Sequence, residues 1–177
     1  IACFAFAYGV LSTYLAIYGK ETLGITSGTG TYFMLLAVGL MSSRLIGSRT
    51  LRQGKITQNA AVGVVISLVG YTLFAGVHEM WAYYLSALVI GLGNGHLFPA
   101  YQTMFINLAP HTQRGTANST LLTSWDLGIG LGILLGGVIA ESIGYEMAFW
   151  AAVLLELAGV ATFFLLVRRH FLANKVR

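Results

Sequence analysis

The sequence is poor in charged residues and has a single cysteine. Only 9% of its 177 residues are Asp, Glu, Lys or Arg, whereas 56% are hydrophobic. Soluble domains typically carry about a quarter charged residues, so this composition is typical of an integral membrane protein. Because Cys3 stands alone, a disulfide framework and a cysteine-based metal site are both excluded. The sequence predicts no metal and no cofactor.

Acidic residues are scarcer than basic ones, and the net charge is +4. The basic residues stand in short segments between apolar runs rather than along one polar face, which argues against a nucleic-acid partner. The chain starts at Ile1, inside an apolar run, without an initiator Met or a basic leader region. We therefore expect a piece of a longer protein, whose first apolar segment is not a signal peptide.

Long apolar segments dominate what is present. A membrane-spanning helix needs roughly 20 mainly apolar residues, and none of the segments alternates with the period of two that marks a membrane β-strand. The segments that qualify are residues 1–19, 29–47, 57–77, 82–107, 116–140 and 147–167. The sequence predicts an all-α integral membrane protein in which residues 1–177 form a single bundle of six transmembrane helices.

The connections between these segments alternate in charge. The first, third and fifth hold Glu21, Glu79, Glu141 and Glu146, with Lys20 as their only base. The other connections and the tail hold no acid, and their bases are Arg49, Arg52, Lys55, Arg114, Arg168, Arg169, Lys175 and Arg177. Basic loops stay cytoplasmic, because Lys and Arg resist translocation. We expect both termini to be cytoplasmic.

Two carboxyl groups lie deep inside predicted spans. A central carboxylate costs about 2.5–3.5 kcal/mol on insertion scales, so such groups usually face the bundle interior or water. We interpret Asp126 as a candidate for proton or cation coupling, or for substrate contact. The alternative is a carboxyl group hydrogen-bonded to a neighbouring helix. Glu156 has no polar residue one turn away, which favours a buried protonated acid without a functional role.

The fourth segment carries a polar face. Pro99 removes a backbone hydrogen bond and predicts a kink near Gly95. Asn94, Phe98 and Gln102 then share one face of the helix. Such a stripe either lines a substrate cavity or links helices by amide hydrogen bonds. His96 lies between the Asn94 and Phe98 directions and is a candidate for proton coupling, with a structural histidine as the alternative.

The remaining candidate residues are three glycines, for helix packing, and one arginine. Gly128, Gly132 and Gly136 form a stripe along the fifth segment, where another helix backbone can approach closely. Arg44 lies three residues inside the cytoplasmic end of the second segment. It can extend to the interface or pair with a carboxylate of a neighbouring helix, and we favour this structural role.

Three stretches resemble one known family: GLGNGHLFPAYQTM, PHTQRGTANST and SWDLGIGLGILLGGVIAE. Over essentially its whole length the chain resembles the C-terminal six-helix half of a major facilitator superfamily transporter, similar to bacterial multidrug or sugar efflux permeases. The resemblance implies half of a 12-helix fold, built from inverted three-helix repeats. It also implies the bacterial cytoplasmic membrane, and a missing N-terminal six-helix half as partner.

The same resemblance implies roles for individual residues. It assigns the substrate cavity to Tyr8, Asn94, Phe98, Gln102, Trp125 and Asp126. It assigns close packing between the two halves to the glycine run of residues 128–137. The basic stretch SRLIGSRTLRQGK, with Arg44, Arg49 and Arg52, resembles the family's cytoplasmic loop motif, and Arg114 lies in the next basic loop. This stretch departs from the motif, because no acid occurs between Glu21 and Glu79.

From these observations we expect a secondary active transporter, specifically a proton-coupled exporter of a small amphipathic or sugar-like molecule that works by alternating access. The alternative is an autonomous six-helix protein that homodimerises as a channel or scaffold. An intramembrane enzyme is disfavoured, because the sequence has neither a G-x-S-x-G elbow nor an H-E-x-x-H motif.

Overall fold

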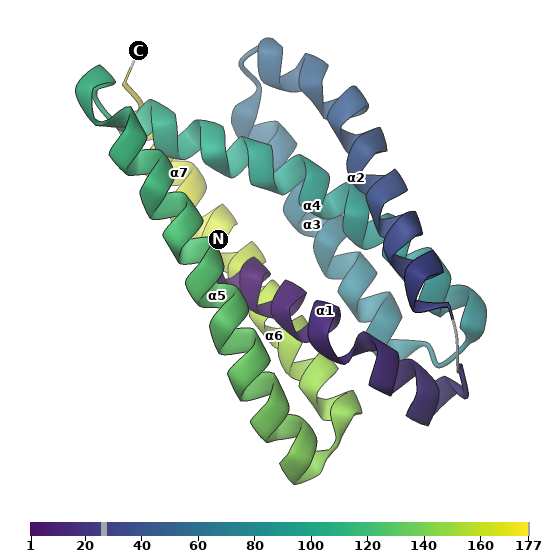
Figure 1. The fold of residues 1–177 in the computed structure, drawn as a ribbon. Coiled ribbons are helices and arrows are strands. Elements are labelled where there is room, and N and C mark those ends of the chain that lie inside the picture. Colours follow the sequence, from purple (N-terminus) through teal and green to yellow (C-terminus); the bar gives the residue numbers. More distant parts are fainter. Residues whose placement is uncertain (26–27, 177) are drawn as a thin grey trace.

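The computed structural model describes residues 1–25 and 28–176, and this part of the chain folds into long helices (Figure 1). They are α1 (Ala2–Leu23), α2 (Thr29–Arg52), α3 (Ile56–Gly76), α4 (Met80–Leu108), α5 (Arg114–Ile143) and α6 (Tyr145–Thr162). A 3₁₀ turn, η1 (His111–Gln113), precedes α5, and a π-helical turn, η2 (Phe163–Val167), leads from α6 into α7 (Arg168–Asn174). The six predicted segments correspond to α1 to α6, so the all-helical prediction is confirmed.

Five segments in the described residues are long and apolar enough to cross a membrane: α1, α2, α3, η1 with α5, and α6 with its continuation. The exception is α4, a helix of 29 residues that is not among these five. Its polar residues Asn94 and His96 are buried among neighbouring helices. Polar groups that face protein rather than lipid are the ones a membrane helix tolerates, so a sixth span through α4 remains a prediction.

Helices that are distant in the sequence pack on one another. α1 packs on α5 and α6, whereas α4 packs on α2 and α3, and contacts between α3 and α6 join the two groups (Figure 1). The buried apolar residues form two clusters. One includes Tyr18, Phe74 and Phe149, and the other includes Phe4, Leu97 and Phe163 at the opposite end. Because the first and last thirds of the chain pack on each other, no segment forms a core of its own.

Glycines set the closest helix contacts. Gly128, Gly132 and Gly136 are buried on the side of α5 that faces α1. A Cβ atom at Gly132 would collide with the backbone of Phe6, and one at Gly91 of α4 would collide with that of Leu36 of α2. The resemblance had implied that the α5 glycines pack against the other half of a transporter. The structure instead packs this stripe inside the bundle, because α1 lies directly on it.

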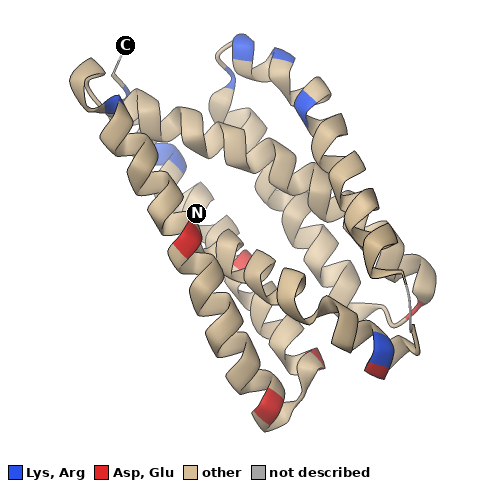
Figure 2. Ribbon diagram, viewed as in Figure 1, with Lys and Arg blue, Asp and Glu red and all other residues tan. Residues whose placement is uncertain are grey.

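Charges separate to the two ends of the bundle (Figure 2). Lys and Arg gather where α2 ends and α5 begins, with Arg49 and Arg52 in the last turn of α2 and Arg114 as the first residue of α5. Most of the acids lie at the opposite end, together with Lys20. Cations at a helix C-terminus interact favourably with the helix dipole. The arrangement agrees with the alternating charges of the connections.

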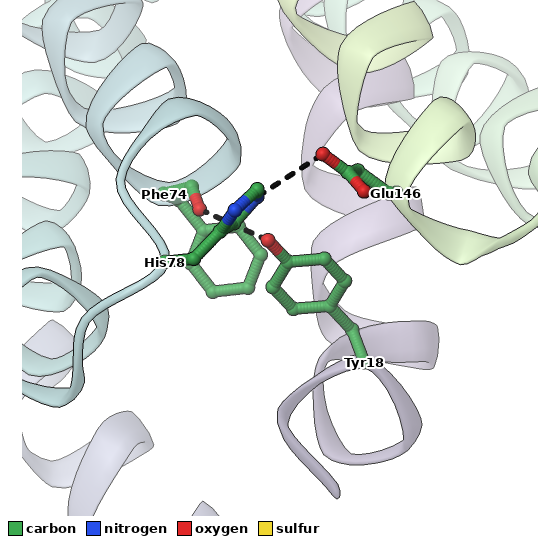
Figure 3. A network of polar contacts seen from close by, with 4 residues as sticks. All are labelled: Tyr18, Phe74, His78 and Glu146. Atoms are coloured by element: carbon green, nitrogen blue, oxygen red, sulfur yellow. Dashed lines mark hydrogen bonds and ion pairs between the residues drawn. The ribbon is translucent and has the colours of Figure 1, made fainter. Parts of the chain in front are cut away.

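Polar contacts link helices at the acidic end (Figure 3). Nε2 of His78, in the connection from α3 to α4, lies 3.1 Å from Oε1 of Glu146 in the first turn of α6, the one ion pair among the described residues. The Tyr18 hydroxyl of α1 donates a long hydrogen bond of 3.5 Å to the carbonyl oxygen of Phe74 in α3. The ring of Tyr18 also packs 5.0 Å from that of Phe74, measured between centroids. Three helices thus meet at this end.

The ion pair at this end is expected to contribute little to stability. The side chains of His78 and Glu146 are 42% and 48% exposed, and exposed pairs are typically worth about 0.2–1 kcal/mol. We expect Glu146→Gln to lower the free energy of unfolding in mildly acidic buffer by less than about 1 kcal/mol, and high salt to remove the difference. Thermal unfolding in detergent measures it. Glu141→Gln, at an exposed acid of α5, is the matched control, and a larger loss that persists in high salt would contradict the prediction.

Candidate functional site

A cavity of about 250 Å³ opens between α1, α2, α4 and α5. It is lined by Tyr8 of α1, by Leu36, Leu40 and Arg44 of α2, by Asn94, Gly95, Phe98 and Pro99 of α4, and by Trp125 of α5. Of the residues named from the sequence for a substrate cavity, the structure brings together Tyr8, Asn94, Phe98 and Trp125. They come from three helices that are distant in the sequence.

Three aromatic rings form one wall of this cavity. The ring of Trp125 lies 5.2 Å from that of Phe98, nearly edge-on at 78°. It lies 6.1 Å from that of Tyr8. Both separations fall within the range of favourable aromatic pairs. All three side chains are only partly buried, so their remaining surface can contact the apolar body of a ligand.

Two polar groups accompany the rings. Asn94 is 6% exposed, and its Oδ1 accepts a hydrogen bond of 3.4 Å from the hydroxyl of Ser67 in α3. Arg44 contributes a guanidinium group from α2 and also borders a neighbouring hollow beside Asn59. Together the cavity combines an aromatic wall with an amide and a permanent cation. The arrangement suits a small molecule that is apolar on one side and polar on the other.

The position of Arg44 differs from the prediction. The sequence placed it three residues from a helix end near residue 47, but α2 continues to Arg52. The helix ends only before Gly54, whose φ of 77° is a left-handed conformation that favours glycine. Arg44 therefore lies eight residues, or about 12 Å, from the helix end. At this depth Arg44 lies on the cavity wall. The sequence signal for the longer helix was the absence of a helix-terminating residue before Gly54.

Gln102 and His96 lie outside the cavity. Nε2 of Gln102 donates a hydrogen bond of 2.9 Å to Oδ1 of Asn118, which links α4 to α5. The ring of His96 is 6% exposed, with Nδ1 2.7 Å from the carbonyl oxygen of Leu92. Neither residue borders the cavity. The geometry of Gln102 is that of an amide linking two helices.

The two deep acids occupy opposite environments. Asp126 is exposed on α5, beside a shallow hollow formed with Thr123 and Leu127. It does not line the cavity that Trp125 borders, because successive residues of a helix are about 100° apart. Glu156 of α6 is completely buried, and neither of its carboxyl oxygens has a hydrogen-bond partner in the described structure. The residues described include no cluster of His, Cys, Asp and Glu that could hold a metal ion.

Comparisons with known proteins point to one family. A family model described as Major Facilitator Superfamily matches residues 60–176. The chain is 26% identical to an uncharacterised MFS-type transporter of Pseudomonas aeruginosa (strain UCBPP-PA14) over 174 residues, which cover 96% of this chain and 42% of that protein. It is 28% identical over 174 residues to the multidrug resistance protein MdtG of Dickeya zeae (strain Ech586), covering 95% of this chain and 41% of that protein.

A third relative, an uncharacterised MFS-type transporter of Burkholderia mallei (strain SAVP1), is 28% identical over 141 residues, covering 76% of this chain and 34% of that protein. The chain thus spans about two fifths of the length of the first of these curated relatives.

Proposed function

Because this chain belongs to the major facilitator superfamily, we propose that it is the C-terminal half of a secondary active transporter for a small amphipathic or sugar-like molecule. Members of this family are transporters rather than enzymes, and the chain is an integral membrane protein with helical spans. The observation that carries the proposal is the cavity between α1, α2, α4 and α5, with its aromatic wall, Asn94 and Arg44. A ligand bound there would place its apolar body against the rings and a polar group near the amide or the guanidinium.

The contacts between helices support an origin from two inverted repeats, α1–α3 and α4–α6. The first helix of each set packs on the second and third helices of the other set: α1 on α5 and α6, α4 on α2 and α3. The third helices, α3 and α6, pack on each other. A two-fold axis in the membrane plane would produce this exchange, and transporters built in this way bind substrate near the middle of the bilayer.

A second six-helix half would complete the cavity. The most apolar stretch is only 28% buried along α2, 22% along η1 with α5 and 28% along α6 with its continuation, and Leu127, Leu131 and Leu134 of α5 are exposed. Of these helices, α2 and α5 border the cavity. We propose that the N-terminal half covers their open faces, and that rocking of the halves opens the cavity to each side in turn. The relatives' greater length supports this view.

We also propose a direction of transport and a coupling ion. The end of the bundle that carries Arg49, Arg52 and Arg114 would face the cytoplasm of a bacterial cell. Export is supported by the name of the Dickeya relative, a multidrug resistance protein. Asp126, exposed on the face that the second half would cover, would bind and release the coupling proton. His96 is a second candidate for that role.

Asp126→Asn tests the coupling role. In proteoliposomes of the intact transporter that carries this chain, we expect the substitution to abolish accumulation driven by a pH gradient, because an amide cannot release a proton. Exchange of labelled for unlabelled substrate should persist. Ethidium serves as the amphipathic probe and lactose as the sugar. Glu141→Gln, an exposed acid at the far end of the same helix, is the matched control. Wild-type accumulation by the Asn variant would exclude Asp126 as the coupling acid.

A further inference from the structure

Glu156 is the most deeply buried ionisable group of the described bundle that has no partner. Its side chain is 0% exposed, and both carboxyl oxygens lack a hydrogen-bond partner. The one ion pair in the described residues is remote, between His78 and Glu146. A buried carboxylate without a counter-charge is strongly disfavoured, so the group occupies this arrangement as a neutral acid.

Close to the carboxyl group of Glu156, the helices packed on α6 place polar side chains without a charge. Ser67 of α3 lies beside the carboxyl group of Glu156. The Tyr71 hydroxyl of the same helix is also buried without a hydrogen-bond partner, and it lies near Glu156. The titratable groups nearest to the carboxyl group are Tyr71 of α3 and Tyr101 of α4. One contact further away lie Tyr8 and Cys3 of α1 and Tyr32 of α2. Among the described residues of α5, no titratable side chain interacts with the carboxyl group of Glu156.

Ser67 connects this acid to the cavity. Its hydroxyl is completely buried and donates to Oδ1 of Asn94 at 3.4 Å, and Asn94 lines the cavity. A serine has one hydroxyl proton to donate, so Ser67 can serve either Asn94 or Glu156 at one time. The bond to Asn94 is long, so little is lost when it breaks.

We propose that Glu156 is a proton-binding site inside the bundle, and that Ser67 couples its protonation state to Asn94 in the cavity. The inference rests on the proposed transport function and adds to it a second proton-binding acid on a helix that does not border the cavity. With the proton bound, Ser67 donates to Asn94, as the structure shows. When the O–H bond of Glu156 breaks, a water molecule that enters beside the carboxyl group takes up the proton. Ser67 then donates to the carboxylate and leaves Oδ1 of Asn94 free to accept from a ligand or from water.

A merely structural acid would behave differently. Glutamine has the shape and neutrality of the protonated glutamate, so a structural role survives Glu156→Gln in every readout. A proton-binding role predicts that Gln holds the bundle in the arrangement of the protonated acid at every pH. The distinction therefore lies in the pH dependence of the cavity and not in folding.

The first test is chemical modification in the intact transporter. Dicyclohexylcarbodiimide, an apolar reagent that reacts with protonated carboxyl groups, is applied over a pH series, and peptide mass spectrometry identifies the modified residues. We expect Glu156 to be modified, with the yield falling as pH rises. The exposed acids Glu141 and Glu146 should remain unmodified under the same conditions. Absence of modification at Glu156 throughout the series would overturn the proton-binding site.

The second test measures how the accessibility of the cavity depends on pH. Leu40→Cys on the cavity wall, in a Cys3→Ser background, is labelled with a membrane-impermeant maleimide. For each pH the labelling rate is compared between proteins with Glu156 and with Glu156→Gln, so the intrinsic pH dependence of the thiol cancels. We expect this ratio to change severalfold across the series, and Ser67→Ala to remove the change.

A ratio that stays constant with pH would overturn the coupling. Neither readout depends on flux. Failure of ethidium and lactose transport with both results intact would refute the proposed substrates and leave the proton site standing. The modification test uses the unaltered protein, so it remains decisive if the Gln variant does not fold.

Discussion

Gly132→Ala is expected to destabilise the bundle by about 1–3 kcal/mol, the range seen when an extra methyl group is forced into a packed contact. A Cβ atom at this position would collide with the carbonyl oxygen of Phe6 and lie 3.0 Å from its carbonyl carbon. A backbone carbonyl cannot rotate aside as a side chain can, so α1 must move away from α5. Tyr8 and Trp125 face each other across the same pair of helices, so the cavity should be distorted as well.

Gly130→Ala provides the matched control for this prediction. Gly130 belongs to the same helix, and a Cβ atom there would meet nothing within 4 Å. Alanine is a better helix former than glycine, so this variant should be neutral or slightly more stable. Unfolding by heat or by denaturing detergent, followed by circular dichroism, measures both. Equal stability of the two variants would show that α1 and α5 do not meet at Gly132.

Trp125→Ala is expected to weaken substrate binding by roughly 2 kcal/mol, or about 30-fold in KM, which is typical of a central aromatic contact. Trp125 is the one cavity residue from α5, and its ring contacts those of Phe98 and Tyr8. Removing it takes away apolar contact area for the ligand and the support of the other two rings. The concentration dependence of ethidium and lactose transport by the intact transporter measures the change.

Trp81→Ala is the matched control for the tryptophan. Trp81 lies in the first turn of α4 and is 60% exposed, at the end of the bundle that carries most of the acids. Its loss should leave KM unchanged. An unchanged KM in Trp125→Ala, or an equal change in both variants, would mean that the cavity between α1, α2, α4 and α5 does not bind the substrate.

Much of the candidate site could be predicted from residue types and helical spacing. The face that carries Asn94 and Phe98 follows from their separation of one turn, and both residues border the cavity. Gln102 continues the same stripe, but Asn118 of α5 lies near enough to accept its amide proton. Which polar group binds a neighbouring helix and which remains free depends on the partner helix, and no periodicity within α4 contains that information.

Arg44 and the two deep acids show the same limit. Their depth could be read from the sequence approximately, but their surroundings could not. Trp125 and Asp126 are adjacent in the chain, yet one borders the cavity and the other is exposed on α5. Glu156 has no polar neighbour along α6, and its polar environment comes from Ser67 and Tyr71 of α3. Contacts between helices decided these environments.

The amino-acid sequence by itself determined that the chain is helical and enters a membrane, the approximate positions of its helices, and which connections share a side. These properties depend on local quantities: the length of each apolar run, the charges between runs and the spacing of glycines. Only the tertiary structure decided which face of each helix meets protein. Lipid tails are as apolar as leucine, so hydrophobic pattern cannot distinguish a face turned toward lipid from one packed on another helix. The pairing of α1 with α5 and of α4 with α2, and the cavity between them, therefore became visible only in three dimensions.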